Sequence, residues 1–212
     1  MRTLVEATGP RPRLAIVLLS GAYAEPEDFL REGFVDALRA RGVEAEVVMA
    51  GVRVAHFADG SVVDRIRDSV LGPVKARGFT RIWIAGISLG ALATLCHAAR
   101  HEDEAERRLL LSPYPGTREV WCEIAAAGGL ASWRPSSPPG GDLEREAWHW
   151  LAQGGARRTP VECWFGAGDR FVEGQRMMAS ALPPASVHEV EGGHGWKDWQ
   201  SMWRDFVRRL PA

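Results

Sequence analysis

The sequence lacks the features that mark several large classes of protein. Its 212 residues include only three cysteines, Cys96, Cys122 and Cys163, and no C-x-x-C pair. Neither a disulfide framework nor a zinc knuckle is therefore indicated. The formal net charge of −1 gives no electrostatic reason to expect nucleic acid or an anionic membrane as a partner. The longest purely apolar run, residues 14–19, is far too short to cross a bilayer.

Targeting and cofactor signals are also missing. The first residues have no apolar signal-peptide core, and together with the cysteine usage this predicts a cytoplasmic protein without stable membrane insertion. No P-loop, G-x-G-x-x-G motif or metal-ligand cluster occurs, so the sequence predicts no cofactor and no metal. Apolar residues make up 46% of the sequence and charged residues 25%, which is typical of a globular protein with a core. The length predicts a single domain, residues 1–212.

Short apolar runs alternate with segments of helical period along the chain. Strands are predicted at 14–19, 43–49, 81–85, 107–111, 161–165 and 186–190. Helices are predicted at 26–41, 62–77, 89–100, 118–127, 143–153, 173–182 and 196–210, with a kink or break at Gly72-Pro73. Because strands and helices alternate, we expect an α/β protein with a doubly wound, mainly parallel sheet and helices on both faces. Residues 113–159 interrupt the pattern as a small helical insertion, with an irregular Ser/Pro/Gly stretch at 133–141.

The most informative motif is Gly86-Ile87-Ser88-Leu89-Gly90, between a predicted strand and a predicted helix. A serine at the apex of such a turn has strained backbone angles, and its neighbours two positions away must be very small. Both of those neighbours are glycine. In this context G-x-S-x-G predicts a nucleophile elbow, which holds the Ser88 hydroxyl above the end of the sheet.

A serine nucleophile needs a base, and the base works best when a carboxylate orients it. Cooperating groups in an open α/β sheet lie on loops at the carboxyl ends of strands. Asp169 lies on such a loop among glycines, whereas Glu162 lies within a strand and Glu173 opens a helix. Asp169 could alternatively be a plain turn residue or a helix N-cap, and the elbow favours the catalytic interpretation.

Six histidines compete as the base. His194 lies in a glycine-rich loop after the last predicted strand, and the glycines allow its ring to approach the serine. Only His56 shares a comparable loop position; the others lie in predicted helices, in a strand or in the insertion, namely His97, His101, His149 and His188. The order Ser88, Asp169, His194 is that of an α/β-hydrolase triad.

From about residue 14 to residue 210, the chain resembles a small α/β-hydrolase of the serine esterase type. The resemblance implies Ser88 as nucleophile, His194 as base and then acid, and Asp169 as the orienting group. It also implies that the Leu89 amide forms half of an oxyanion hole. The second amide would come from the loop 20–24, where many relatives carry His-Gly and this chain has Ser-Gly. The donor is then Ala22 or Tyr23, and we expect Ala22.

The insertion at 113–159 lies over the active site in such folds and would act as a cap. It contains four of the nine tryptophans: Trp121, Trp133, Trp148 and Trp150. They could line an apolar acyl or aromatic pocket, or they could pack two short helices onto the body. The recurrence of Trp196, Trp199 and Trp203 indicates a packed helix face.

The sequence therefore predicts a carboxylic-ester hydrolase that forms an acyl-enzyme and acts on small to medium apolar acyl esters. A thioesterase or an amidase would use the same triad. A non-catalytic binding protein of the same fold is a further alternative, although it would have no reason to keep all three groups. A nucleotide-binding α/β protein would need a phosphate-cradling loop after the first strand, which this chain lacks.

Overall fold

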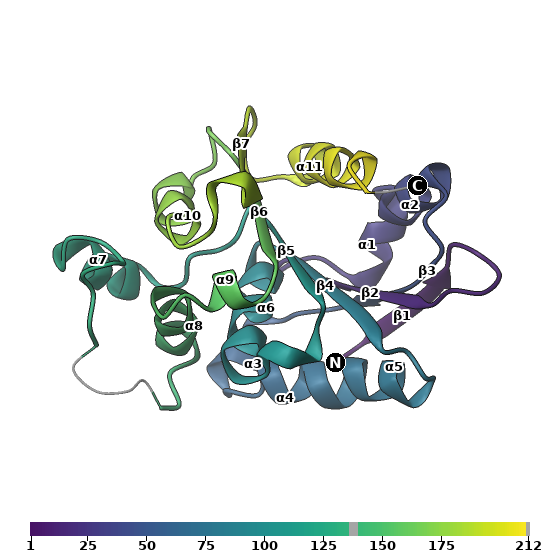
Figure 1. Cartoon of the computed structure of the whole chain (residues 1–212), viewed down its shortest axis with the longest axis horizontal. Helices are drawn as coiled ribbons and strands as arrows, with labels where there is room; N and C mark the ends of the chain where they lie inside the picture. The colour runs from purple at the N-terminus through teal and green to yellow at the C-terminus, as the bar shows by residue number, and fades with distance from the viewer. Residues whose placement is uncertain (136–139, 211–212) are drawn as a thin grey trace.

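A computed structural model describes residues 1–135 and 140–210. Within them, one sheet has the strand order β1-β3-β2-β4-β5-β6-β7 (Figure 1). The antiparallel pair is β1 with β3, and the other neighbouring pairs are parallel. The strands are β1 Thr3–Ala7, β2 Leu14–Leu19, β3 Ala45–Ala50, β4 Arg81–Ile87, β5 Arg107–Leu111, β6 Val161–Gly166 and β7 Val187–Val190. The predicted doubly wound, mainly parallel sheet is confirmed.

Helices cover both faces of the sheet, and each face has its own apolar cluster. One face is covered by α1 Pro26–Arg31, α2 Phe34–Arg41 and α11 Trp196–Arg208 (Figure 1). The opposite face is covered by α4 Val62–Ile66, η1 Arg67–Leu71, α5 Gly72–Ala76, α6 Leu89–Arg100 and α10 Val172–Ala179. Short helical segments complete the body: α3 Val54–Ala58, η2 Glu102–Glu104 and η3 Pro184–Ser186.

Three helices lie between β5 and β6, in the stretch predicted as an insertion. They are α7 Arg118–Ala126, α8 Leu143–Ala152 and α9 Gly155–Arg158. In Figure 1, α7, α8 and α10 are drawn at the left of the sheet, and α8 packs on α6. Part of the predicted irregular stretch 133–141, residues 136–139, lies outside the described residues.

Two predicted helices differ from the structure for backbone reasons. The segment 26–41 forms two helices, because Gly33 has φ 74° and turns the chain between α1 and α2. The segment 62–77 stays helical through Gly72-Pro73, where a kink or break was predicted. The turn over η1 is a π-helix in which the Gly72 amide donates to the Arg67 carbonyl, five residues back. This wider turn precedes Pro73, which has no amide hydrogen to donate.

The sequence prediction missed β1. Its residues alternate between exposed and half-buried, so no continuous apolar run marks it. It adds an antiparallel edge next to β3, which places β3 second in the sheet. None of the helices in the described part of the chain is both long and apolar enough to cross a membrane.

Candidate active site

Ser88 lies at the sharp turn that joins β4 to α6. Its backbone has φ 53° and ψ −113°, a conformation that non-glycine residues rarely adopt. The turn is so tight that a Cβ on Gly86 would lie 2.2 Å from the carbonyl oxygen of Gly90. A Cβ on Gly90 would lie 2.2 Å from the carbonyl oxygen of Leu19, at the end of β2. Glycine at both flanks is therefore a steric requirement, as predicted.

The structure brings Ser88, Asp169 and His194 together. Asp169 follows β6 and His194 follows β7, and both strands run parallel to β4, so all three residues lie at the carboxyl edge of the sheet. His194 Nε2 lies 2.9 Å from Ser88 Oγ, and His194 Nδ1 lies 2.7 Å from Asp169 Oδ2. This geometry fits a serine hydroxyl that donates to Nε2 and an Nδ1–H that donates to the carboxylate.

The Asp169 carboxylate is buried and accepts several hydrogen bonds. Besides His194 Nδ1, the Gln175 amide donates to Oδ2 over 2.9 Å and the Phe171 backbone N–H donates to Oδ1 over 2.9 Å. Burial alone acts to raise the pKa of this carboxyl, but the three hydrogen bonds together outweigh it. The pKa of Asp169 is therefore below its usual value, and the group is ionised at neutral pH.

Aromatic rings hold the imidazole of His194 from two sides. Phe171 meets it edge-to-face with ring centroids 5.0 Å apart, and Trp199 does so at 5.2 Å. Phe171 in turn contacts Tyr114 at 5.2 Å. Only 7% of the His194 side chain is exposed. The ring is thus restricted in rotation and shielded from water on these sides, while Ser88 stays partly exposed.

Solved structures of several hydrolases are similar to this chain across nearly its whole length. FphF, a fluorophosphonate-binding serine hydrolase of Staphylococcus aureus, is 15% identical over 94% of this chain and 84% of its own, with a TM-score of 0.66. Est1E from Butyrivibrio proteoclasticus is 17% identical over 97% and 90%, with a TM-score of 0.62. A Paleococcus ferrophilus monoacylglycerol lipase is 16% identical over 98% of each chain, with a TM-score of 0.61.

The chain has the α/β-hydrolase fold. The resemblance to small α/β-hydrolases of the serine esterase type, first drawn from the sequence, holds at the level of structure. No protein-family model matches the sequence, and no curated protein matches it either. At these low identities the similarity establishes the fold, and the activity is argued below from the site.

The other acids and histidines weighed from the sequence lie outside the hydrogen bonds that join Ser88, His194 and Asp169. Glu162 pairs with Arg107 and with His188, and Glu173 is exposed. His97 is buried on α6 beside Glu104. The other histidines considered from the sequence, His56, His101 and His149, form no hydrogen bond with Ser88 among the described residues.

The loop after β2, residues 20–24, lies beside the elbow. A Cβ on Gly21 would lie 3.7 Å from Ser88 Cβ. The Ser20 hydroxyl accepts from the Val52 amide and donates to the Ala24 carbonyl, which ties the loop to the end of β3. Ala22 is half-buried, whereas the Tyr23 side chain is 96% exposed.

Three tryptophans of the insertion are buried and hydrogen-bonded. The Trp148 indole N–H donates to the Pro115 carbonyl, that of Trp133 donates to Glu123, and that of Trp150 donates to Glu102. All three belong to the apolar core that the insertion shares with α6. This favours the packing interpretation over a tryptophan-lined substrate pocket. The fourth, Trp121, is only half-buried.

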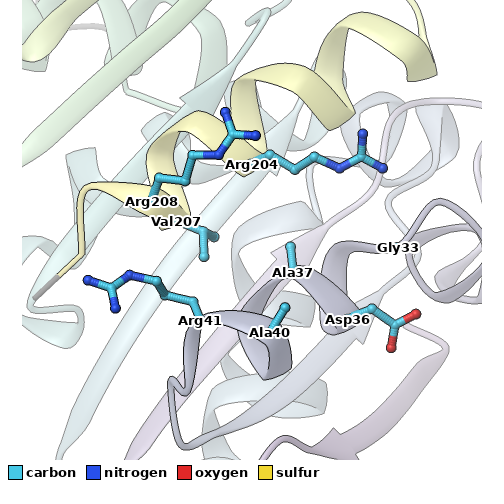
Figure 2. A pocket seen from close by; sticks show the side chains of 8 residues that line it. All are labelled: Gly33, Asp36, Ala37, Ala40, Arg41, Arg204, Val207 and Arg208. Atoms are coloured by element: carbon cyan, nitrogen blue, oxygen red, sulfur yellow. The ribbon is translucent and has the colours of Figure 1, made fainter. Parts of the chain in front are cut away.

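A hollow of about 460 Å³ lies away from the triad, between α2 and α11. In Figure 2 the charged ends of Arg41 and Asp36 extend in opposite directions, away from its middle. None of Ser88, Asp169 and His194 lines it. Among the described residues, no three His, Cys, Asp or Glu side chains gather in a way that could hold a metal ion. The candidate active site therefore rests on the triad geometry.

Proposed function

We propose that this protein is a serine hydrolase that cleaves carboxylic esters through an acyl-enzyme intermediate. The observation that carries the proposal is the position of His194, which bridges Ser88 Oγ and Asp169 Oδ2 at 2.9 and 2.7 Å. These are the distances at which a base can take a proton and a carboxylate can orient it. The ferulic acid esterase and the monoacylglycerol lipase among the similar structures support the same reaction class.

In the first half of the reaction, Ser88 Oγ attacks the ester carbonyl carbon and its proton passes to His194 Nε2. The ionised Asp169 stabilises the imidazolium that forms. The tetrahedral intermediate then breaks its bond to the alcohol oxygen, and that oxygen takes the proton from His194. The products of this half are the acyl ester of Ser88 and a free alcohol.

Two backbone amides would stabilise the oxyanion. Leu89 is the first residue of α6, so its N–H has no partner within the helix and lies at the positive end of the helix dipole. In the loop after β2, the amides of Ser20 and Ala24 donate to Ala50 and Gly21, which leaves the amides between them available among the described contacts. Ala22 is our choice for the second donor.

In the second half, a water molecule replaces the alcohol. His194 Nε2 takes a proton from the water as its oxygen attacks the acyl carbon, and the same two amides hold the oxyanion again. Collapse of the intermediate returns the proton to Ser88 Oγ and releases a carboxylic acid. The enzyme is regenerated without any further co-reactant.

The surroundings of His194 favour an apolar acyl group of small to medium size. Phe171 and Tyr114 form an aromatic edge that begins at the His194 ring and is partly exposed. An apolar acyl chain or ring would remove this edge from water on binding. The buried insertion tryptophans add no further lining, which argues against a long lipid chain as the substrate.

The test is chemical. A fluorophosphonate should label the purified protein on Ser88, and the protein should hydrolyse p-nitrophenyl acetate and butyrate. Ser88→Ala should abolish both activities, whereas Ser132→Ala, at an exposed serine of the insertion, should change neither. A folded protein that is neither labelled nor active would refute the proposal. Hydrolysis rates on a panel of matched esters, thioesters and amides then show which kind of bond is cleaved fastest. A clear preference for thioesters or amides would replace the ester assignment.

A further inference from the structure

Gln175 is a buried polar residue that the sequence did not indicate. It lies on α10 and is fully shielded from solvent. Its side-chain amide nitrogen donates hydrogen bonds to two groups. Nε2 lies 2.9 Å from Asp169 Oδ2 and 3.1 Å from the carbonyl oxygen of Pro113. Asp169 Oδ2 is the same oxygen that accepts from His194 Nδ1. One carboxylate oxygen is thus shared by the imidazole and by Gln175.

The second contact joins Gln175 to the loop that supports the nucleophile. Pro113 is the second residue after β5, and the next residue, Tyr114, donates its backbone N–H to the Ser88 carbonyl over 3.1 Å. A Cβ on Gly174 would lie 2.6 Å from the Pro115 side chain, so α10 approaches this loop closely. The single amide group of Gln175 therefore links the acid loop to the loop beneath the elbow.

The buried position of Gln175 leaves one of its polar atoms without a hydrogen bond in the described part of the chain, which costs free energy that packing alone does not explain. Gln175 Oε1 is buried and has no hydrogen-bond partner among the described residues. An unpaired buried carbonyl is unfavourable, and an apolar side chain of the same size would avoid that cost. The amide donor is the part of the side chain that the site uses.

We propose that Gln175 is a positioning residue of the triad, which fixes the Asp169 carboxylate so that Oδ2 faces His194. The inference rests on the proposed hydrolase function. A carboxylate can rotate about its Cβ–Cγ bond, and donors to both oxygens restrict that rotation: Phe171 N–H on Oδ1, and Gln175 together with His194 on Oδ2. Removal of the Gln175 donor leaves Oδ2 with His194 alone.

Besides the triad itself, the structure places Arg170 over the Phe171 ring and Asp198 beside the glycines that flank His194. Gln175 itself contacts one titratable group, Asp169. The Asp169 carboxylate in turn accepts a hydrogen bond from His194. Arg176, the neighbour of Gln175, pairs with Glu189 at the exposed surface. Loss of the donor makes the Asp169 carboxylate a stronger acceptor for the His194 proton. The acid limb of the pH dependence of kcat/KM should then move to higher pH.

Two substitutions separate positioning from packing. Gln175→Met fills nearly the same space without a donor, and Gln175→Ala leaves a cavity as well. If the donor matters, both variants lose kcat by about tenfold to a hundredfold, the range for a lost hydrogen bond to a charged group, with KM nearly unchanged. A packing role predicts instead that the Met variant keeps its kcat and that only the Ala variant is impaired. Gln153→Met, at an exposed glutamine, is the matched control and should behave as the native protein.

A double-mutant cycle adds a readout that a structural role would not move. In an Asp169→Asn background the carboxylate is gone, so Gln175→Met should cost little further activity. Losses that simply multiply would overturn the proposal, as would a folded Gln175→Met variant with native kcat and pH profile.

Should the Met variant not fold, the native protein supplies the test by NMR. The side-chain amide protons of Gln175 should shift as the triad titrates, and shifts that stay constant with pH would refute the role. Failure of native Ser88 to react with a fluorophosphonate would instead refute the proposed function itself.

Discussion

Gly90 lies so close to the end of β2 that a Cβ on it would be 2.2 Å from the carbonyl oxygen of Leu19. Both partners in this contact are backbone, so no flexible side chain can give way. Gly90→Ala should therefore force the elbow away from the sheet and lower the free energy of unfolding by about 3 kcal/mol or more, the upper part of the range for overpacking. Urea unfolding followed by tryptophan fluorescence measures this loss.

Gly140→Ala is the matched control for that substitution. An added Cβ at Gly140, an exposed residue, meets no atom of the described residues within 4 Å. The control should leave stability within about 0.5 kcal/mol of the native protein, as surface substitutions usually do. Equal stability of the Gly90 variant and the control would show that the elbow can relax.

Asp169→Asn should reduce kcat by roughly a thousandfold to ten-thousandfold, because an amide cannot hold the His194 Nδ1–H tautomer as a carboxylate does. The measurement is steady-state hydrolysis of p-nitrophenyl acetate at pH 8. Asp205→Asn is the control, since Asp205 pairs with Arg208 at the surface of α11. A loss of less than tenfold at Asp169 would mean that another group orients the imidazole.

The sequence predicted most of the sheet because its inner strands contain short apolar runs that are bounded by glycine or charged residues. The proposed triad residues Ser88, Asp169 and His194 could be picked out because each lies on a turn or loop after a predicted strand, with glycines nearby. The π-helical turn of η1 was not predictable in the same way. Gly72-Pro73 signals a break, but whether the helix widens or stops depends on the apolar face that it buries against the sheet.

Gln175 shows the other limit of sequence reasoning. A glutamine one turn into a helix has no local signal that distinguishes an exposed residue from a buried donor. Its partners, Asp169 and the Pro113 carbonyl, are brought to it by the packing of α10 against the loop after β5. Likewise the tryptophans of the insertion could be counted, but only the structure shows that Trp148 is buried within the core.

The stability of the protein should fall as pH falls from 6.5 towards 4, partly because of His97. This residue is fully buried on α6, and burial lowers its pKa to about 4, with the nearby Arg108 acting in the same direction and the hydrogen bond to Glu104 opposing them. Between pH 6.5 and about 4 the unfolded chain binds a proton at this site and the folded chain does not. The free energy of unfolding therefore decreases as pH decreases across that window.

His97→Gln removes this titration. From pH 7 to pH 5 the native protein should lose about 2 kcal/mol more than the variant does, since each pKa unit corresponds to about 1.4 kcal/mol. The comparison uses the change with pH and not the absolute stability, because the substitution also alters the contact with Glu104. Urea unfolding at both pH values measures it. Parallel pH dependence in the two proteins would show that folded His97 is protonated as readily as a free histidine.

Trp148→Phe should destabilise the protein by about 2 to 4 kcal/mol, because it leaves a small cavity and an unpaired Pro115 carbonyl in the core. Trp121→Phe, at the half-buried tryptophan of the same insertion, should cost about 1 kcal/mol or less. Because Trp148 packs the insertion and does not line the site, the relative rates on acetyl, butyryl and octanoyl esters should not change. A Trp148 variant of native stability that accepts longer acyl chains would show that this ring bounds the acyl pocket.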